Sequence, residues 1–83
     1  MAHQPLTRLL KLPEVCERRA RGATSHYNDI SRGLWTRPVK CGVRSSSWPE
    51  HEVEALIRAR IAGKTDDEIR ALVAKLEADR AKA

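Results

Sequence analysis

Aromatic residues are scarce in this chain of 83 residues, which has Trp35, Trp48, Tyr27 and no phenylalanine. Leucine, isoleucine, valine and alanine must therefore fill most of the core, and a chain of this length buries only about 60 to 65% of its unfolded surface. Loss of either tryptophan is expected to be costly. Single-stranded RNA binding is disfavoured, because it usually stacks bases on exposed aromatic rings and these three are expected in the core.

Long apolar runs and metal-binding patterns are missing as well. No hydrophobic stretch approaches the length of a spanning helix, and the N-terminus lacks the apolar region of a signal peptide, so we expect a cytoplasmic protein without a membrane partner. Cys16 and Cys41 lie 25 positions apart and have no Cys-x-x-Cys or Cys-x-x-His neighbour. We expect two buried thiols and no metal or other cofactor; a disulfide, or a zinc site that recruits His26 or His51, is the less favoured alternative.

No arrangement of residues typical of catalysis is present. Ser25, His26 and Asp29 are close in the sequence, but neighbours in a short polar helix do not make a hydrolase triad without an oxyanion site or a pocket. We therefore do not expect an enzyme.

Positive charge is in excess, and it is unevenly distributed. Residues 1–48 carry nine Lys and Arg against three Asp and Glu, whereas residues 49–83 carry seven against eight. An even spread would suggest only solubility, but concentration in one half favours a face that binds a polyanion. Nucleic acid is the favoured polyanion, and an anionic membrane surface is the competitor.

The first half is predicted to begin with a strand and a helix. Residues 7–11, TRLLK, read as a strand or an extended lead-in whose leucines pack inward. A helix follows from Leu12, with Pro13 in its first turn, and continues to about Ala20, where Gly22 ends it.

A second short helix is predicted from about Ala23 to Gly33, which stops it in a left-handed conformation. A Thr-Ser pair at its start can cap it, and Tyr27 and Ile30 are expected on its inner face. Two short helices joined by a glycine-containing turn make a helix-turn-helix, whose second helix normally enters the major groove of DNA.

The segment GLWTRPVKCGVRSSS, residues 33–47, reads as a basic hairpin, or wing, directly behind this helix. Pro38 and Val39 favour an extended backbone, and Gly42 permits a tight reversal. Trp48 would anchor the hairpin on the core, while the cationic tip stays free to meet a phosphate backbone. A solvated hairpin whose cations only keep the protein soluble is the alternative.

Two more helices are predicted in the second half. The first starts at Pro49, carries glutamates in its early turns and ends at Gly63. Its buried stripe is expected to consist of Val53, Leu56, Ile57 and Ile61. Thr65 and Glu68 then form a capping box for a final amphipathic helix to about Lys82. The stripe of this helix either folds back on the core or docks on another subunit or protein. It consists of Ile69, Leu72, Val73 and Leu76.

Four ordered motifs carry a resemblance to a known family. LLKLPEV at residues 9–15, HYNDI at 26–30, GLWTRPVKCG at 33–42 and WPEHEVEALIRARIAG at 48–63 together resemble the AlpA family of phage-type regulators. That family is similar to excisionases and other small winged helix-turn-helix proteins, and its members act as transcriptional activators or as recombination directionality factors beside tyrosine integrases.

The resemblance implies a mainly α fold with a small β-hairpin. An excisionase- or MerR-like winged helix-turn-helix is expected at residues 1–63, and a C-terminal amphipathic helix, for packing or oligomerisation, at residues 64–83. A bacterial, nucleoid-associated protein of a mobile element is the implied setting.

DNA contacts are expected from the second helix, from the wing and from the end of the first helix. On the second helix they are Thr24, Ser25, Asn28 and Arg32. On the wing they are Arg37, Lys40, Arg44, Ser45 and Ser46. The arginines that reinforce this clamp are Arg18, Arg19 and Arg21. Asn28 is able to read adenine bidentately, and Arg32 to read guanine or a phosphate.

Two further residues of the second helix have alternative interpretations. His26 is favoured as a core histidine with one hydrogen-bonded nitrogen over a base contact. Asp29 is favoured as an ion-pair partner of Arg32 or Arg21 over an acceptor for a cytosine amino group.

The expected mechanism is binding to double-stranded DNA without chemistry. If roughly five phosphates are neutralised, log affinity falls with log salt at a slope of about −4 to −5, and one monomer binds weakly. Head-to-tail assembly on direct repeats would add affinity and bend DNA. We favour an excisionase that bends attachment-site DNA for a tyrosine integrase over an AlpA-type transcriptional regulator. A protein-binding adaptor is the alternative from another class.

Overall fold

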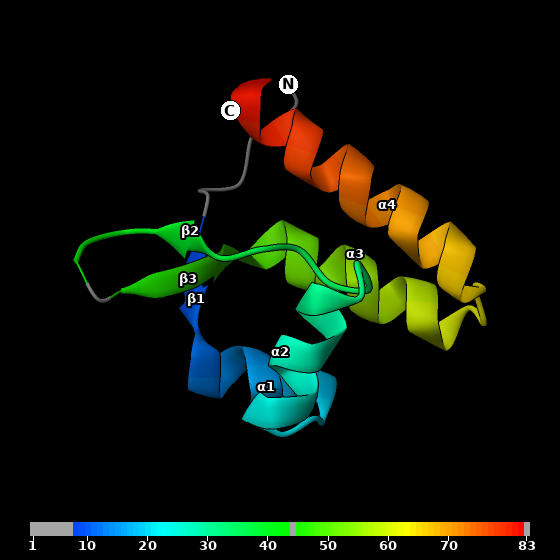
Figure 1. Cartoon of the computed structure of the whole chain (residues 1–83), viewed down its shortest axis with the longest axis horizontal. Helices are drawn as coiled ribbons and strands as arrows, with labels where there is room; N and C mark the ends of the chain where they lie inside the picture. Colours follow the sequence, from blue (N-terminus) through cyan, green and yellow to red (C-terminus); the bar gives the residue numbers. More distant parts are fainter. Residues whose placement is uncertain (1–7, 44, 83) are drawn as a thin grey trace, which may run out of the picture.

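The computed structural model describes residues 8–43 and 45–82, and these form four α-helices, a short 3₁₀-helix and a three-stranded antiparallel sheet (Figure 1). The prediction of a mainly α fold is confirmed. Predictions made for Thr7 and Arg44 lie outside the described residues. In chain order the elements are β1 (Leu9–Lys11), α1 (Leu12–Arg19), α2 (Ala23–Ser31), β2 (Val39–Lys40), β3 (Ser46–Pro49), α3 (Glu50–Ile61), α4 (Asp66–Asp79) and the 3₁₀-helix η1 (Arg80–Lys82).

The sheet has the strand order β1-β3-β2, so the predicted two-stranded hairpin gains a third strand from the N-terminal lead-in. Leu10 on β1 pairs with Trp48 on β3, and Val39 on β2 pairs with Ser47. Successive side chains of a strand point to opposite faces, and only one of the two leucines of β1 packs inward. Leu10 is buried, whereas Leu9 is 45% exposed.

The turn between α1 and α2 differs from the prediction. α1 ends at Arg19, and its C-cap is Ala20, which adopts a left-handed conformation with φ 57°; Gly22 does not end the helix. Gly22 has φ −73° and is the N-cap of α2, where neither Thr24 nor Ser25 supplies a side-chain cap. Gly33 follows α2 with φ 76°, and its predicted left-handed conformation is confirmed.

One cluster of buried apolar side chains forms the core, and it includes residues from both predicted regions, 1–63 and 64–83. Both tryptophans lie in it, and the indole Nε1 of Trp48 donates a 2.8 Å hydrogen bond to the carbonyl oxygen of Thr36. The cluster consists of Leu10, Val15, Leu34, Trp35, Trp48, Val53, Leu56, Ala59, Ile69, Val73 and Leu76. The expectation of buried cysteines is wrong, because Cys16 is half-buried and Cys41 is exposed.

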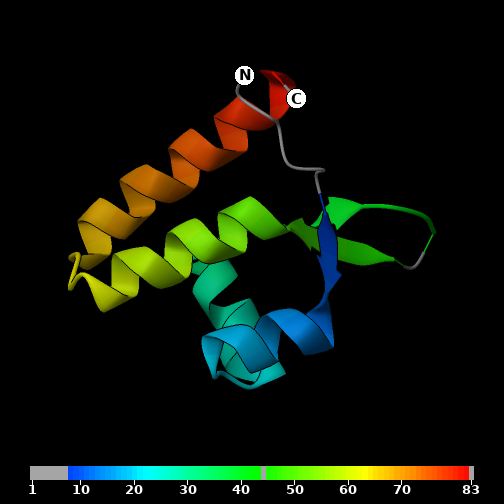
Figure 2. The same ribbon diagram turned by 180° about the vertical axis from the view of Figure 1, so that it is seen from behind.

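Helices α3 and α4 lie side by side (Figures 1 and 2). The stripe of α3 is shorter than predicted, because Ile61 is 80% exposed at the end of the helix. The capping box at the start of α4 is confirmed: the Thr65 hydroxyl accepts from the Glu68 amide, and the Glu68 carboxylate accepts from the Thr65 amide.

The stripe of α4 folds back on the core of its own chain. Ile69, Val73 and Leu76 are buried, and Leu72 packs partly buried against the same cluster. The alternative, that this stripe docks on another subunit or protein, is wrong, because the core of the same chain already covers these side chains.

A buried ion pair attaches the end of the chain to the start of α3. Glu52 is fully buried and accepts two hydrogen bonds, of 2.7 and 2.8 Å, from the guanidinium of Arg80 in η1. Arg80 also donates to the carbonyl oxygen of Arg37 at the base of the hairpin. None of the helices in the described part of the chain is long and apolar enough to cross a membrane.

Candidate nucleic-acid interface

Helix α2 has a buried polar face and an exposed polar face. His26 and Asp29 are buried, and Ile30 packs partly buried against the core. Tyr27 was predicted on the inner face, but it is 45% exposed. It shares the outer face with Thr24 and Asn28, so this face carries hydroxyl and amide groups that suit phosphates and base edges.

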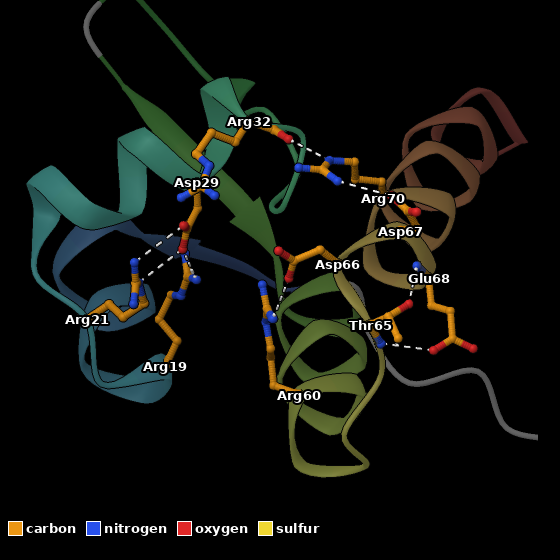
Figure 3. Close-up of polar contacts among 10 residues, drawn as sticks. All are labelled: Arg19, Arg21, Asp29, Arg32, Arg60, Thr65, Asp66, Asp67, Glu68 and Arg70. Carbon is orange, nitrogen blue, oxygen red and sulfur yellow. Dashed lines mark hydrogen bonds and ion pairs between the residues drawn. The ribbon is translucent and has the colours of Figure 1, made fainter.

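The inner face of α2 is held by a network of charged side chains. Asp29 accepts from the guanidinium of Arg19, and the Nε of Arg21 lies 3.0 Å from the same carboxylate (Figure 3). The Arg19 guanidinium also lies 3.9 Å from the centre of the Trp35 ring. Ion pairing of Asp29 with Arg21 is as predicted. The assignment of Arg19 to DNA is wrong, because its side chain is only 5% exposed and its guanidinium is already held by Asp29, His26 and the Trp35 ring.

His26 completes this network as a neutral residue. The Arg19 guanidinium lies 2.8 Å from His26 Nδ1 and is only a donor, so Nδ1 accepts and the ring proton sits on Nε2. Burial, together with the charge of Arg19, lowers the pKa of His26 from 6.5 to about 4. The prediction of a core histidine with one hydrogen-bonded nitrogen is confirmed. Its ring packs edge-on against Trp48, with centroids 4.8 Å apart.

Trp48 connects the hairpin to α2. Besides the contact with His26, its ring lies 6.5 Å from the ring of Tyr27. Because Trp48 is a residue of β3 and is fully buried, the base of the hairpin is fixed beside α2, as the predicted anchor requires. The hairpin itself projects away from the helices (Figures 1 and 2).

The cations of the hairpin differ in what they contact. Arg37 is 77% exposed, but both its backbone amide and its guanidinium donate to Glu77 on α4. Lys40 is exposed, and its Nζ lies 3.4 Å from the Ser46 hydroxyl on the facing strand. Ser45 is exposed in the loop before β3. Lys40 and Ser45 are therefore accessible to a phosphate.

The charge asymmetry between the halves of the chain is partly offset in space. Arg18 donates to Glu14 at 2.7 Å and to Glu50 at 2.8 Å, and Glu77 reaches Arg37. Glu50 and Glu77 both belong to the acidic second half. Folding thus neutralises part of the basic half, and Arg18 is less available for a phosphate than the sequence suggests.

The missed residues lack a local signal. Glu50 lies 32 positions from Arg18, which it contacts. Glu77 and Arg80 both contact Arg37 and lie 40 and 43 positions from it. His26 and Asp29 lie about one turn apart and are both buried, so they occupy the inner face of α2 and leave Tyr27 on the outer face. In the described part of the chain, no group of three or more His, Cys, Asp or Glu side chains is arranged to hold a metal ion.

Comparisons with known proteins identify no relative. No family model matches the chain, and neither the curated proteins nor the solved structures include a match.

Proposed function

We propose that this protein binds double-stranded DNA as a winged helix-turn-helix, with the outer face of α2 in the major groove and the β2–β3 hairpin on the flanking backbone. The position of Trp48 supports this proposal most strongly. Its ring packs on both His26 and Tyr27, so an exposed polar helix and a protruding basic hairpin are held at a constant separation. A protein that contacts the major groove and the flanking backbone of a duplex at the same time needs such a fixed separation.

Exposed residues near the start and middle of α2 make the base contacts in this proposal. Residues near the N-terminus of a recognition helix usually reach base edges. Thr24 lies in the first turn of α2, and Asn28 lies one turn further along the same exposed face. Asn28 reads adenine, and the Tyr27 hydroxyl adds a phosphate contact. Lys40, Ser45 and Ser46 contact the backbone from the hairpin.

The favoured biological role is excision of a mobile element, where the bound protein bends attachment-site DNA for a tyrosine integrase. A monomer with few phosphate contacts binds weakly, and head-to-tail neighbours on direct repeats would add affinity and curvature. Transcriptional regulation of phage or integrative-element genes by the same bound protein is the alternative. Both rest on the resemblance to the AlpA family.

A salt-titrated binding isotherm on DNA from around the encoding locus tests the proposal, with an unrelated duplex for comparison. Asn28→Ala should lose about 1 to 3 kcal/mol of discrimination between the two duplexes. Lys40→Ala should weaken binding to both and reduce the salt slope by about 1.

Lys64→Ala is the matched control, because it removes the same charge from the exposed α3–α4 turn. An affinity that changes neither with salt nor in any of the three variants would contradict DNA binding and favour a protein-binding adaptor. If DNA binding holds, energy transfer between dyes at the two duplex ends distinguishes the roles: an architectural excisionase should shorten the end-to-end distance.

A further inference from the structure

A groove of about 610 Å³ lies between the α1–α2 pair and the end of α3. Four parts of the chain form it: the end of α1 with the α1–α2 turn, the end of α2 with the segment that follows it, the last turns of α3, and the start of α4. Figure 3 shows Arg19, Arg21 and Asp29 on one side of it and Arg60 with Asp66 on the other. Its volume falls within the range of about 300 to 1,000 Å³ that is typical of ligand sites.

The walls of this groove carry an excess of positive charge. Five arginines line it against two aspartates, Asp29 and Asp66, although one of the five, Arg18, is already paired with Glu14 and Glu50 outside the groove. Arg19 and Arg21 already share Asp29, and no described residue accepts a hydrogen bond from the guanidinium of Arg32. Arg60 pairs with Asp66 at 3.2 Å, but both side chains are about half exposed, so solvent screens the pair. Arg32 and Arg60 are therefore available to an incoming anion.

The groove also has an apolar side. Leu34, Trp35 and Ile57 line it together with Ile61. Ile61 is 80% exposed, although its spacing in α3 predicts burial. An isolated exposed isoleucine is ordinary, but this one continues an apolar surface that begins inside the groove between arginines.

We propose that the groove binds an acidic, leucine-containing peptide segment of a partner protein. Carboxylates match the forked donors of Arg32 and Arg60, and an aliphatic side chain would cover Ile57 and Ile61. A ligand with only one of these two chemistries would leave the other half of the site unused. The groove thus gives the protein a second interaction surface, which adjoins the proposed DNA-binding helix at Arg32.

A peptide fits this site better than duplex DNA does. The phosphates of a duplex lie on its convex outer surface and bring no aliphatic group to an apolar floor. The groove also lies at the α3–α4 turn, whereas the hairpin projects in the opposite direction (Figure 1). Arg32 at the end of α2 lines the groove and was also expected to contact DNA, so the duplex titration in the experiment below tests whether the two sites are separate.

The test is a titration of the isotopically labelled full chain, followed by amide chemical shifts, with a short capped peptide of alternating glutamate and leucine. Two control peptides replace leucine by serine or glutamate by lysine, and a short duplex is titrated separately. The double variant Arg60→Ala with Ile61→Ser removes one anchor of each kind. Arg58→Ala is the matched control, because Arg58 is exposed on the same helix and does not line the groove.

The expected result is that the glutamate–leucine peptide shifts the amides of Arg32 and of residues 57–61. Its affinity should fall about tenfold in the double variant and stay unchanged in Arg58→Ala. The proposal is overturned if this peptide shifts none of these amides, or if the glutamate–serine peptide binds equally well. It is also overturned if duplex DNA shifts them and the double variant loses DNA affinity, since the groove would then belong to the DNA site. A chain that binds the peptide but no DNA would refute only the proposed function.

Discussion

The α1–α2 pair and the α3–α4 pair are both two helices joined by a short turn, but different chemistry holds each pair together. Arg19 on α1 is buried against His26 and Asp29 on α2. Between α3 and α4 the buried contacts come mainly from apolar side chains such as Leu56, Ile69 and Val73. Hydrogen bonds and ion pairs have direction, whereas apolar burial has none. The angle between α1 and α2 therefore depends on specific partners.

The two turns differ in the same way. α1 ends in a left-handed alanine, Ala20, and α2 begins without a side-chain cap. α3 is followed by a left-handed glycine, Gly63, and α4 begins with the capping box of Thr65. The second pair follows the local rules of helix formation, and the first departs from them beside the proposed DNA-binding helix. Such departures concentrate at functional sites, which accords with the proposal.

The largest expected effect is removal of the carboxylate in the first pair. Asp29→Ala leaves the buried Arg19 guanidinium without its anion and should reduce the free energy of unfolding by about 3 to 5 kcal/mol in a denaturant titration. The control is Asp67→Ala, because the Asp67 side chain is 95% exposed.

A double variant, Arg19→Met with Asp29→Leu, separates loss of the charge pair from loss of packing. It should recover most of the stability lost in Asp29→Ala, since no buried charge remains. Equal stability of Asp29→Ala and Asp67→Ala would show that the two helix pairs do not differ in this respect.

The next effect is acid sensitivity, which His26 should confer on the first pair alone. Its folded pKa of about 4 lies below the ordinary 6.5, so the unfolded chain binds more protons between these values. The contribution of neutral His26 to the free energy of unfolding should be fully present above pH 6.5. It should fall by about 3 kcal/mol as the pH drops to 4.

Denaturation midpoints at several pH values, for wild type and His26→Leu, measure this contribution as a difference. The control is His51→Leu, because His51 is exposed on α3. Its midpoints should change with pH in the same way as those of the wild type. A wild-type protein that keeps its stability from pH 6.5 to 4 would be incompatible with a neutral, buried His26.

The smallest expected effects come from the two turns and have opposite signs. Gly63→Ala places a side chain at φ 79° and should destabilise by about 1 to 2 kcal/mol, although nothing lies within 4 Å of the new Cβ. Ala20→Gly relieves the same strain at φ 57° and should stabilise by about 0.5 to 1 kcal/mol. Thermal unfolding of both variants gives the signs; a loss of stability in Ala20→Gly would mean that the Ala20 methyl group contributes more than the strain costs.

Local patterns account for most of the elements. Pro13, Pro49 and the Thr65–Glu68 capping box predict the helix starts within a residue or two, because caps act over a single turn. Gly33 was correctly predicted as left-handed. Ala20 was not, since nothing local marks an alanine for this conformation and only the required turn into α2 imposes it.

The sequence by itself determined the order of the helices, the position of the hairpin, its anchor Trp48 and the polar outer face with Thr24 and Asn28, because these depend on spacing and turn chemistry within a few residues. Only the tertiary structure decided which charges are free. Arg19 is buried, Arg18 and Arg37 are paired with distant glutamates, and Arg32 faces the groove. The physical reason is that an ion pair forms wherever folding brings opposite charges together. The separation of two residues along the chain does not show whether folding will do so.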